Sequence, residues 1–207
     1  RQTDNTKRGP FGLLFLFISN GTLRPRPVGF LKELPGGHGV IAYLLLSVFP
    51  AALLIAAAND IYEFKIPNWI SIILIAVYPA AGFAIGASPH VVVEGALIGA
   101  AALTIGFALF ALKIIGGGDA KLFAATAPWL GLSSLGIFLF NTAVSGLVLA
   151  LAMGMFRKFP VLPVYAHAPW LIRLHERKKD LPYAVAIASG ALLSFSQTPY
   201  FQLVIGG

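Results

Sequence analysis

Long apolar runs constrain the fold of this chain more than any other feature. A helix needs about 20 apolar residues to cross a hydrocarbon core roughly 30 Å thick. Six segments approach that length, at about residues 40–59, 69–87, 91–115, 120–132, 134–156 and 182–204. The fourth segment is short and contains Pro128, so we expect it to tilt or to end early. The sequence therefore predicts an all-α, polytopic membrane protein with about six transmembrane helices.

The composition agrees with a membrane protein. Hydrophobic residues make up 57% of the chain and charged residues 11%, whereas a soluble domain has about 45–50% apolar residues. The net charge is +7, but no basic segment carries the interleaved aromatic residues of a nucleic-acid site. We therefore expect membrane lipid, and no nucleic acid, as a partner. The chain has no cysteine and its four histidines are scattered, so no metal site and no cofactor are predicted.

The amino-terminal residues do not fit this pattern. The run FGLLFLFI, residues 11–18, is too short to span a bilayer, and the basic, turn-rich segment SNGTLRPRPVGF follows it. We divide the chain into an atypical basic tail at residues 1–39, either disordered or interfacial, and a six-helix membrane domain at residues 40–207.

The loops differ in charge. Nine cations follow the first, third and fifth apolar segments: Lys65, Lys113, Lys121, Arg157, Lys158, Arg173, Arg177, Lys178 and Lys179. The loops on the other side, around GASPH and GLSS, contain no lysine or arginine. Basic loops remain in the cytoplasm, so the sequence predicts that the nine cations face the cytoplasm. The basic tail would then lie on the opposite side, against this rule.

Two aspartates stand at ends of predicted spans on the cytoplasmic side. Asp60 ends the first span in AANDIYEFKIPN, and Asp119 opens the fourth in GGGDAKL. The three glycines before Asp119 permit close approach of a helix or a substrate strand. On position alone, an equally weighted interpretation is that both are ordinary helix-terminal residues, paired with Lys65 and Lys121.

Other catalytic arrangements have less support. GGGDAK lacks the Gly-Lys-Ser/Thr ending of a phosphate-binding loop. Ser189 lies in a span, but all four histidines fall in predicted loops, so a serine protease site within the membrane is not indicated.

The two aspartate segments resemble those of the type IV prepilin peptidases. The resemblance covers about residues 41–195 and includes a weaker match at LPYAVAIASGA near the last span. The matching positions are Asp60, Ile66, Pro67, Asn68, Gly116, Gly118, Asp119, Lys121 and Leu122.

The resemblance implies a membrane aspartic endopeptidase that removes the leader from prepilin or pseudopilin precursors, after a glycine, at the cytoplasmic membrane boundary. Asp60 and Asp119 would be the catalytic pair. Larger family members have a cysteine-rich insert and also methylate the new amino terminus. This chain lacks both cysteines and room for the insert, so it is similar to the short, peptidase-only branch of Flp-type pili. Which pilin it cuts, and its oligomeric state, are left open.

The residues around the pair are expected to shape the site. Gly116 and Gly118 would allow close approach, while Pro67 and Asn68 would shape the start of the second helix and so place Asp60. Lys121 would either bind a substrate carbonyl or act on Asp119, although its place at the cytoplasmic edge is explained equally well by orientation.

The chemistry of such a pair is sound. Two ionised carboxylates about 4 Å apart repel by roughly 4 kcal/mol at an effective dielectric constant of 20, so one keeps a proton. The ionised partner can then activate a water molecule.

Two alternatives use other functional classes. A small proton-coupled transporter would use the same two aspartates as proton carriers. A non-catalytic assembly protein of the pilus or secretion machinery would not use them in catalysis at all.

Overall fold

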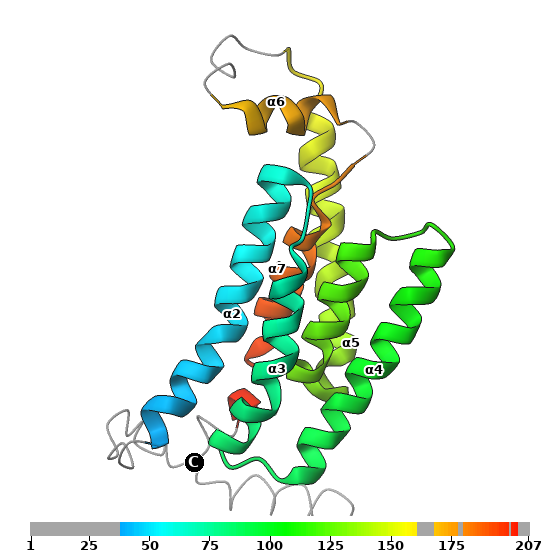
Figure 1. Cartoon of the computed structure of the whole chain (residues 1–207). Helices are drawn as coiled ribbons and strands as arrows, with labels where there is room; N and C mark the ends of the chain where they lie inside the picture. Colours follow the sequence, from blue (N-terminus) through cyan, green and yellow to red (C-terminus); the bar gives the residue numbers. More distant parts are fainter. Residues whose placement is uncertain (1–37, 161–167, 178–179, 199, 203–207) are drawn as a thin grey trace, which may run out of the picture. The chain divides into compact units, whose positions relative to one another are not determined.

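The computed structural model describes residues 38–160, 168–177, 180–198 and 200–202, which belong to one compact unit, residues 35–207. The tail predicted at residues 1–39 lies almost wholly outside the described residues. The helices are α2 (His38–Glu63), α3 (Asn68–Ala84), α4 (Pro89–Ala111), α5 (Gly117–Phe156), α6 (Pro169–Glu176) and α7 (Tyr183–Phe195) (Figure 1). Since the described residues include no strand, the all-α prediction is confirmed.

Helix α5 is a hairpin of two antiparallel halves. Gly131 has φ 70° and ψ 166°, a conformation that essentially only glycine adopts. The rings of Phe123 and Phe138 stack with centroids 5.2 Å apart, whereas a straight helix would separate residues 15 positions apart by about 22 Å. Figure 1 shows the second half of α5 returning along the first. The predicted division into segments at 120–132 and 134–156 therefore matches the reversal at Gly131.

By length and composition, three of the described helices can cross a membrane: residues 40–63, α4 and α5. Helices α3 and α7 are apolar but shorter, with 17 and 13 residues. The count of about six spans stays a prediction.

Helix α4 ends before the apolar sequence does. We predicted a span over residues 91–115, but Lys113 adopts a left-handed conformation, with φ 60°. The N–H groups of Lys113 and Ile114 then bond back to the carbonyls of Phe110 and Leu109. This turn ends α4, and the apolar character of the sequence does not predict it. Ile114 and Ile115 therefore lie in the connection to α5.

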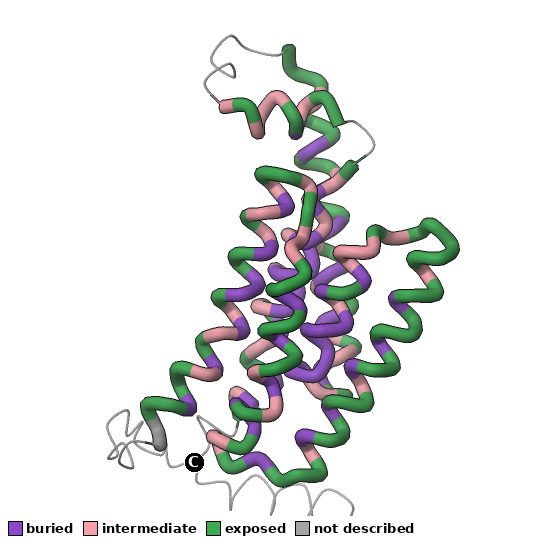
Figure 2. Tube along the Cα trace, viewed as in Figure 1, coloured by how far each residue is buried: buried purple, intermediate pink, exposed green. Residues whose placement is uncertain are grey.

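The core of the bundle centres on Trp129 in the first half of α5. The indole is fully buried, stacks on Phe49 of α2 with centroids 5.1 Å apart, and donates its N–H to the Leu74 carbonyl of α3 at 3.0 Å. Figure 2 shows buried residues concentrated inside the bundle and exposed residues on its outer surface. That surface includes large apolar side chains such as Leu97, Phe107 and Leu147, as expected of helices that contact lipid.

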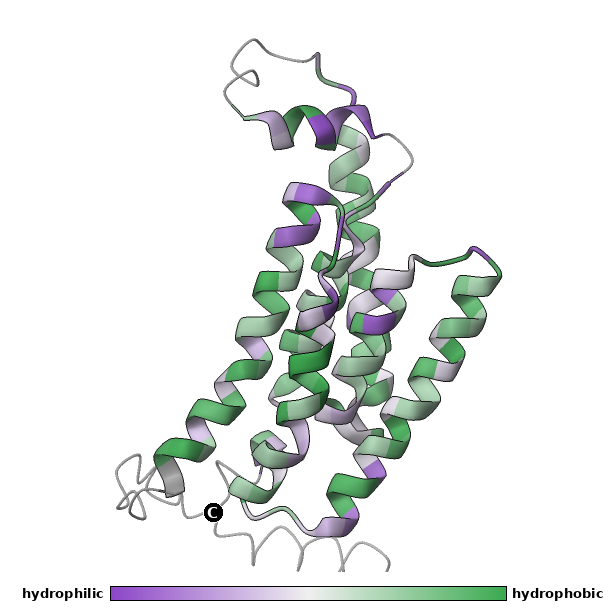
Figure 3. Cartoon of the chain, viewed as in Figure 1, coloured by the Kyte–Doolittle hydropathy of each residue, from purple (hydrophilic) through white to green (hydrophobic). Residues whose placement is uncertain are grey.

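The lysine and arginine residues of the described part of the chain gather at one end of the bundle. Figure 3 shows hydrophilic residues around the α2–α3 and α4–α5 connections and on α6. Of the nine cations counted above, the seven whose positions are described belong to these connections, to the adjoining helix ends or to α6. The opposite end, at residues 85–88 and 131–134, has no lysine or arginine. The predicted asymmetry of charge is therefore present in the fold.

Candidate active site

Asp60 lies in the last turn of α2 and is 5% exposed. Helix α2 ends three residues later because Phe64 turns into the left-handed region, with φ 54°, while its N–H still bonds to the Asp60 carbonyl at 2.9 Å. The Asp60 side chain accepts a hydrogen bond at Oδ2 from the backbone N–H of Ala184, 2.9 Å away in the first turn of α7. The ends of two helices therefore fix this buried carboxyl group.

Asp119 lies in the first turn of α5, where the positive end of the helix dipole favours a carboxylate. Gly116 precedes the helix as its N-cap, with extended φ −71° and ψ 147°, and its backbone hydrogen-bonds to the Asp119 carboxyl group. A Cβ atom at Gly116 would lie only 2.8 Å from Oδ2 of Asp119. The absence of a side chain at Gly116 therefore leaves room for the carboxyl group.

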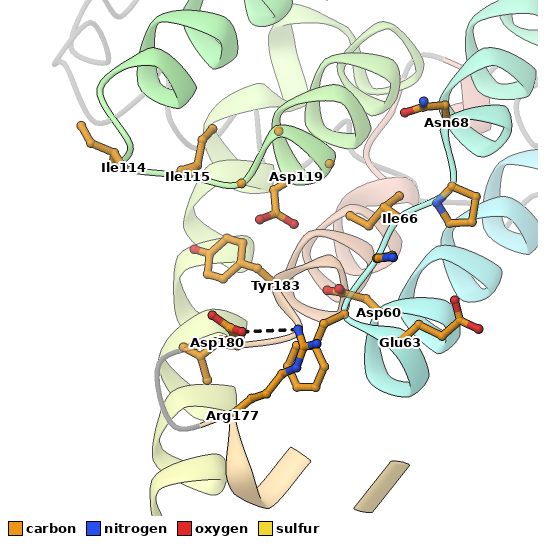
Figure 4. Close-up of a pocket in the computed structure, with 17 residues that line it drawn as sticks. Asp60, Glu63, Ile66, Asn68, Ile114, Ile115, Asp119, Arg177, Asp180 and Tyr183 are labelled. Carbon is orange, nitrogen blue, oxygen red and sulfur yellow. Dashed lines mark ion pairs between the residues drawn. The ribbon is translucent and has the colours of Figure 1, made fainter. Parts of the chain in front are cut away.

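The two carboxyl groups face one pocket of about 980 Å³. In Figure 4, Asp119 and Asp60 point into this pocket from α5 and α2, with Tyr183 and Ile66 beside them. Their charges interact unfavourably, because each ionised group repels the other. A pair of this kind can hold one proton between two carboxyl groups and bind a water molecule, which is the requirement for acid–base hydrolysis.

The predicted site-shaping residues lie around this pair. Gly118 approaches Ile66 so closely that an added Cβ atom would be 3.3 Å from Cβ of Ile66. Pro67 is the extended residue before α3, with φ −62° and ψ 134°, and Asn68 begins that helix. Pro67, Asn68, Gly116 and Gly118 all line the pocket.

Lys121 makes a contact that the sequence did not predict. Its ammonium group donates to Oδ1 of Asn68 at 3.1 Å. This bond links the first turn of α5 to the first residue of α3, and so connects the two segments on which the resemblance rests. Lys121 does not itself line the pocket.

Ten other residues that line the pocket were not among the predicted site residues. They are Glu63, Phe64, Lys65, Ile114, Ile115, Gly117, Arg177, Asp180, Leu181 and Tyr183. The weaker match at LPYAVAIASGA was a signal for Tyr183 and Ala184, whose helix packs against α2 and α5. Nothing in the sequence signalled Arg177 and Asp180, which looked like members of a basic loop.

The described residues hold no group of three or more histidine, cysteine, aspartate or glutamate side chains that could bind a metal ion.

Comparison with known proteins gives the same assignment as the motifs. Residues 47–151 match the type IV leader peptidase family. The chain is 30% identical over 165 residues to a prepilin leader peptidase/N-methyltransferase of Bacillus subtilis (strain 168), an alignment that covers 76% of this chain and 59% of the relative. The chain thus spans about three-fifths of the length of that relative. No solved structure matches it significantly. On the family match, which includes both Asp60 and Asp119, this chain belongs to the type IV leader peptidase family.

Proposed function

We propose that this protein is an aspartic endopeptidase that removes the leader peptide from prepilin-like precursors, with Asp60 and Asp119 as its catalytic pair. The observation that carries the proposal is that Asp60, near the end of α2, and Asp119, at the start of α5, line the same pocket. Family membership and the prepilin leader peptidase relative support the choice of substrate class.

In the proposed mechanism, the two carboxyl groups share one proton. The ionised carboxylate takes a proton from a bound water molecule, and the water oxygen attacks the peptide carbonyl carbon. The protonated partner donates a hydrogen bond to the carbonyl oxygen as negative charge develops there. A proton then passes to the leaving nitrogen as the C–N bond breaks, and the pair returns to its singly protonated state.

The position of the pair favours a peptidase over the transporter alternative. Asp60 is three residues from the end of α2, and Asp119 is the third residue of α5. Both therefore lie near one end of the bundle, where a precursor can enter from the membrane surface. A proton carrier would be expected near mid-membrane instead, with broken helices or further polar groups beside it.

The same proposal gives an orientation. Because the cation-bearing end of the bundle also carries the pocket, the positive-inside rule places the pocket at the cytoplasmic face of the inner membrane. Flp-type pilins are the proposed substrates, since the chain lacks the cysteines of the larger, methylating members.

Co-expression tests the function directly. A candidate Flp-type prepilin is produced in cells with the wild-type protein or with the Asp60→Asn variant, and the pilin is analysed by mass spectrometry. We expect loss of the leader after a glycine with the wild-type protein alone. An intact leader in the presence of inserted wild-type protein, across the candidate pilins of the same genome, would reject the proposal.

A further inference from the structure

Arg177 lies in the pocket of the aspartates, in the connection between α6 and α7. Six acidic or basic side chains line this pocket: the carboxyl groups of Asp60, Glu63, Asp119 and Asp180, and the cationic groups of Lys65 and Arg177. The acidic groups outnumber the basic ones, so any further carboxylate that enters the pocket will be repelled unless a cation is placed to receive it.

The guanidinium group of Arg177 packs over the face of an aromatic ring. Its Cζ atom lies 5.2 Å from the ring centroid of Phe64. Phe64 has the left-handed backbone conformation that is unfavourable for a large side chain, and its N–H bonds to the carbonyl of Asp60. The residue that supports Arg177 is therefore attached to the helical turn that carries one of the two aspartates.

The backbone on both sides of Arg177 is anchored as well. Arg157, at the end of α5, donates from Nε to the carbonyl of Leu174 at 3.1 Å and from Nη2 to the carbonyl of Asp180 at 2.7 Å. The N–H of Arg177 itself bonds to the carbonyl of Arg173 at 3.0 Å. These bonds anchor Leu174 and Asp180, one on each side of Arg177, and the backbone of Arg177 itself, which reduces the cost of ordering its side chain on binding.

The ion pair that Arg177 makes is a weak one. Its Nη1 atom is 3.6 Å from Oδ2 of Asp180, and the two side chains are 49% and 55% exposed. Exposed ion pairs at this distance contribute little to stability. A guanidinium group also has five N–H donors, so one carboxylate does not use all of them. A second carboxylate can therefore bind to Arg177 without first breaking a strong interaction.

We propose that Arg177 is a specificity-determining residue that binds a carboxylate of the peptide in this pocket. The proposal rests on the proposed peptidase function and adds a recognition site to it. Two sources supply such a carboxylate. One is an acidic side chain of the precursor, and the other is the new terminal carboxylate that hydrolysis creates on the leader.

Three variants of the full-length protein in detergent separate this role from a structural one. Arg177→Gln removes the charge, and Arg177→Lys keeps the charge but loses the planar fork. Arg173→Gln is the matched control, because Arg173 is an exposed arginine on α6 that does not line the pocket. Thermal unfolding of each variant shows whether it is folded.

The first experiment measures inhibition of precursor cleavage by a synthetic leader peptide with a free carboxyl terminus or with an amidated one. If Arg177 binds the product, the free acid inhibits the wild-type protein about ten-fold more strongly than the amide. That ratio falls to about one in Arg177→Gln, is intermediate in Arg177→Lys and is unchanged in Arg173→Gln.

The second experiment replaces each acidic residue of a precursor peptide near the cut by its amide and measures KM and kcat. If Arg177 binds a side chain, one such replacement raises the wild-type KM about ten-fold with little change in kcat. The same replacement has no further effect in Arg177→Gln, as expected when the two groups interact directly.

The inference is overturned if folded Arg177→Gln has the wild-type KM and both peptide comparisons give the same ratios as in the wild-type protein. This outcome is distinct from failure of the proposed function, in which the wild-type protein itself cuts no precursor or Asp60→Asn retains activity.

Discussion

The backbone N–H of Ala184 donates a 2.9 Å hydrogen bond to Oδ2 of Asp60, which precedes it by 124 positions in the chain. A buried carboxyl group without a partner is costly, so this bond helps to stabilise Asp60 in a site that is 5% exposed. It also fixes the first turn of α7 against the last turn of α2. The helix that follows the basic connection is thereby part of the site, although none of its side chains belongs to the acid pair.

Gly116→Ala should lower activity without unfolding the protein. The backbone at Gly116 is extended, so alanine is tolerated, but its Cβ atom would lie 2.8 Å from Oδ2 of Asp119 and would displace that carboxyl group. Misplacement of a reacting group by about 1 Å can reduce the rate up to a hundred-fold. We expect a ten- to hundred-fold decrease in kcat/KM, measured with a precursor peptide.

Gly154→Ala is the control for this variant, because an added Cβ atom at Gly154 meets nothing within 4 Å. Its kcat/KM should equal that of the wild-type protein. If Gly116→Ala has the kcat/KM of the wild-type protein, the carboxyl group of Asp119 does not need the space beside Gly116.

Gly131→Ala should destabilise the fold through the hairpin of α5. With φ 70° and ψ 166°, Gly131 occupies a region that costs other residues about 1–3 kcal/mol. Thermal unfolding in detergent should show a lower Tm. Gly136→Ala, at a helical position where an added Cβ atom meets nothing within 4 Å, should leave Tm unchanged or raise it. A Gly131→Ala variant as stable as Gly136→Ala would mean that the chain does not reverse at this residue.

The sequence predicted the helical class, the division of residues 120–156 and the motif residues that line the pocket, because each depends on local signals. Apolar length marks the helices, and the fixed Asp, Ile-Pro-Asn and Gly-x-Gly-Asp patterns mark Asp60 and Asp119. Arg177 and Asp180 could not be predicted, because their place in the pocket depends on bonds from Arg157 and on stacking over Phe64. Those contacts join residues that are distant in sequence and carry no periodic pattern.

The contact of Lys121 is another example of a contact between distant residues that the sequence does not predict. We predicted that Lys121 would bind a substrate carbonyl or act on Asp119, or that its charge would only set the orientation of the protein. In the structure its ammonium group donates to Asn68, 53 positions earlier. Only the packing of α3 against α5 brings the two together.

The distribution of charge predicts the topology of the membrane domain. A reporter that is active only in the periplasm should be active when fused after Gly86 and inactive when fused after Lys113, because Lys113 lies at the cation-bearing end of the bundle. Fusions after Lys65 should agree with those after Lys113. The reverse pattern would place the aspartates outside the cytoplasm and contradict the orientation.

The amino-terminal tail should be dispensable for cutting. The family match begins at residue 47, and the apolar run at residues 11–18 is too short to span a membrane. Deletion of residues 2–35 should leave precursor cleavage within a few-fold of the full chain, as measured by the fraction of mature pilin at equal levels of inserted protein. An inserted but inactive deletion variant would assign the tail a role in catalysis or in substrate binding.

Replacement of the aspartates by asparagine tests the acid pair itself. Asparagine keeps the size of the side chain, and its carbonyl oxygen can still accept the hydrogen bond from Ala184, so the fold should be retained. Each single variant loses either the base or the proton donor, which should reduce kcat by at least about a hundred-fold. Because the two groups act as a unit, the Asp60→Asn, Asp119→Asn and double variants should be about equally inactive.

Glu94→Gln is the control, since Glu94 is a partly exposed carboxylate 3.9 Å from His90, near the start of α4 and outside the pocket. It should cut precursor at the wild-type rate. Near wild-type cutting by correctly inserted Asp60→Asn protein would exclude the aspartic mechanism and favour the transporter or assembly alternatives.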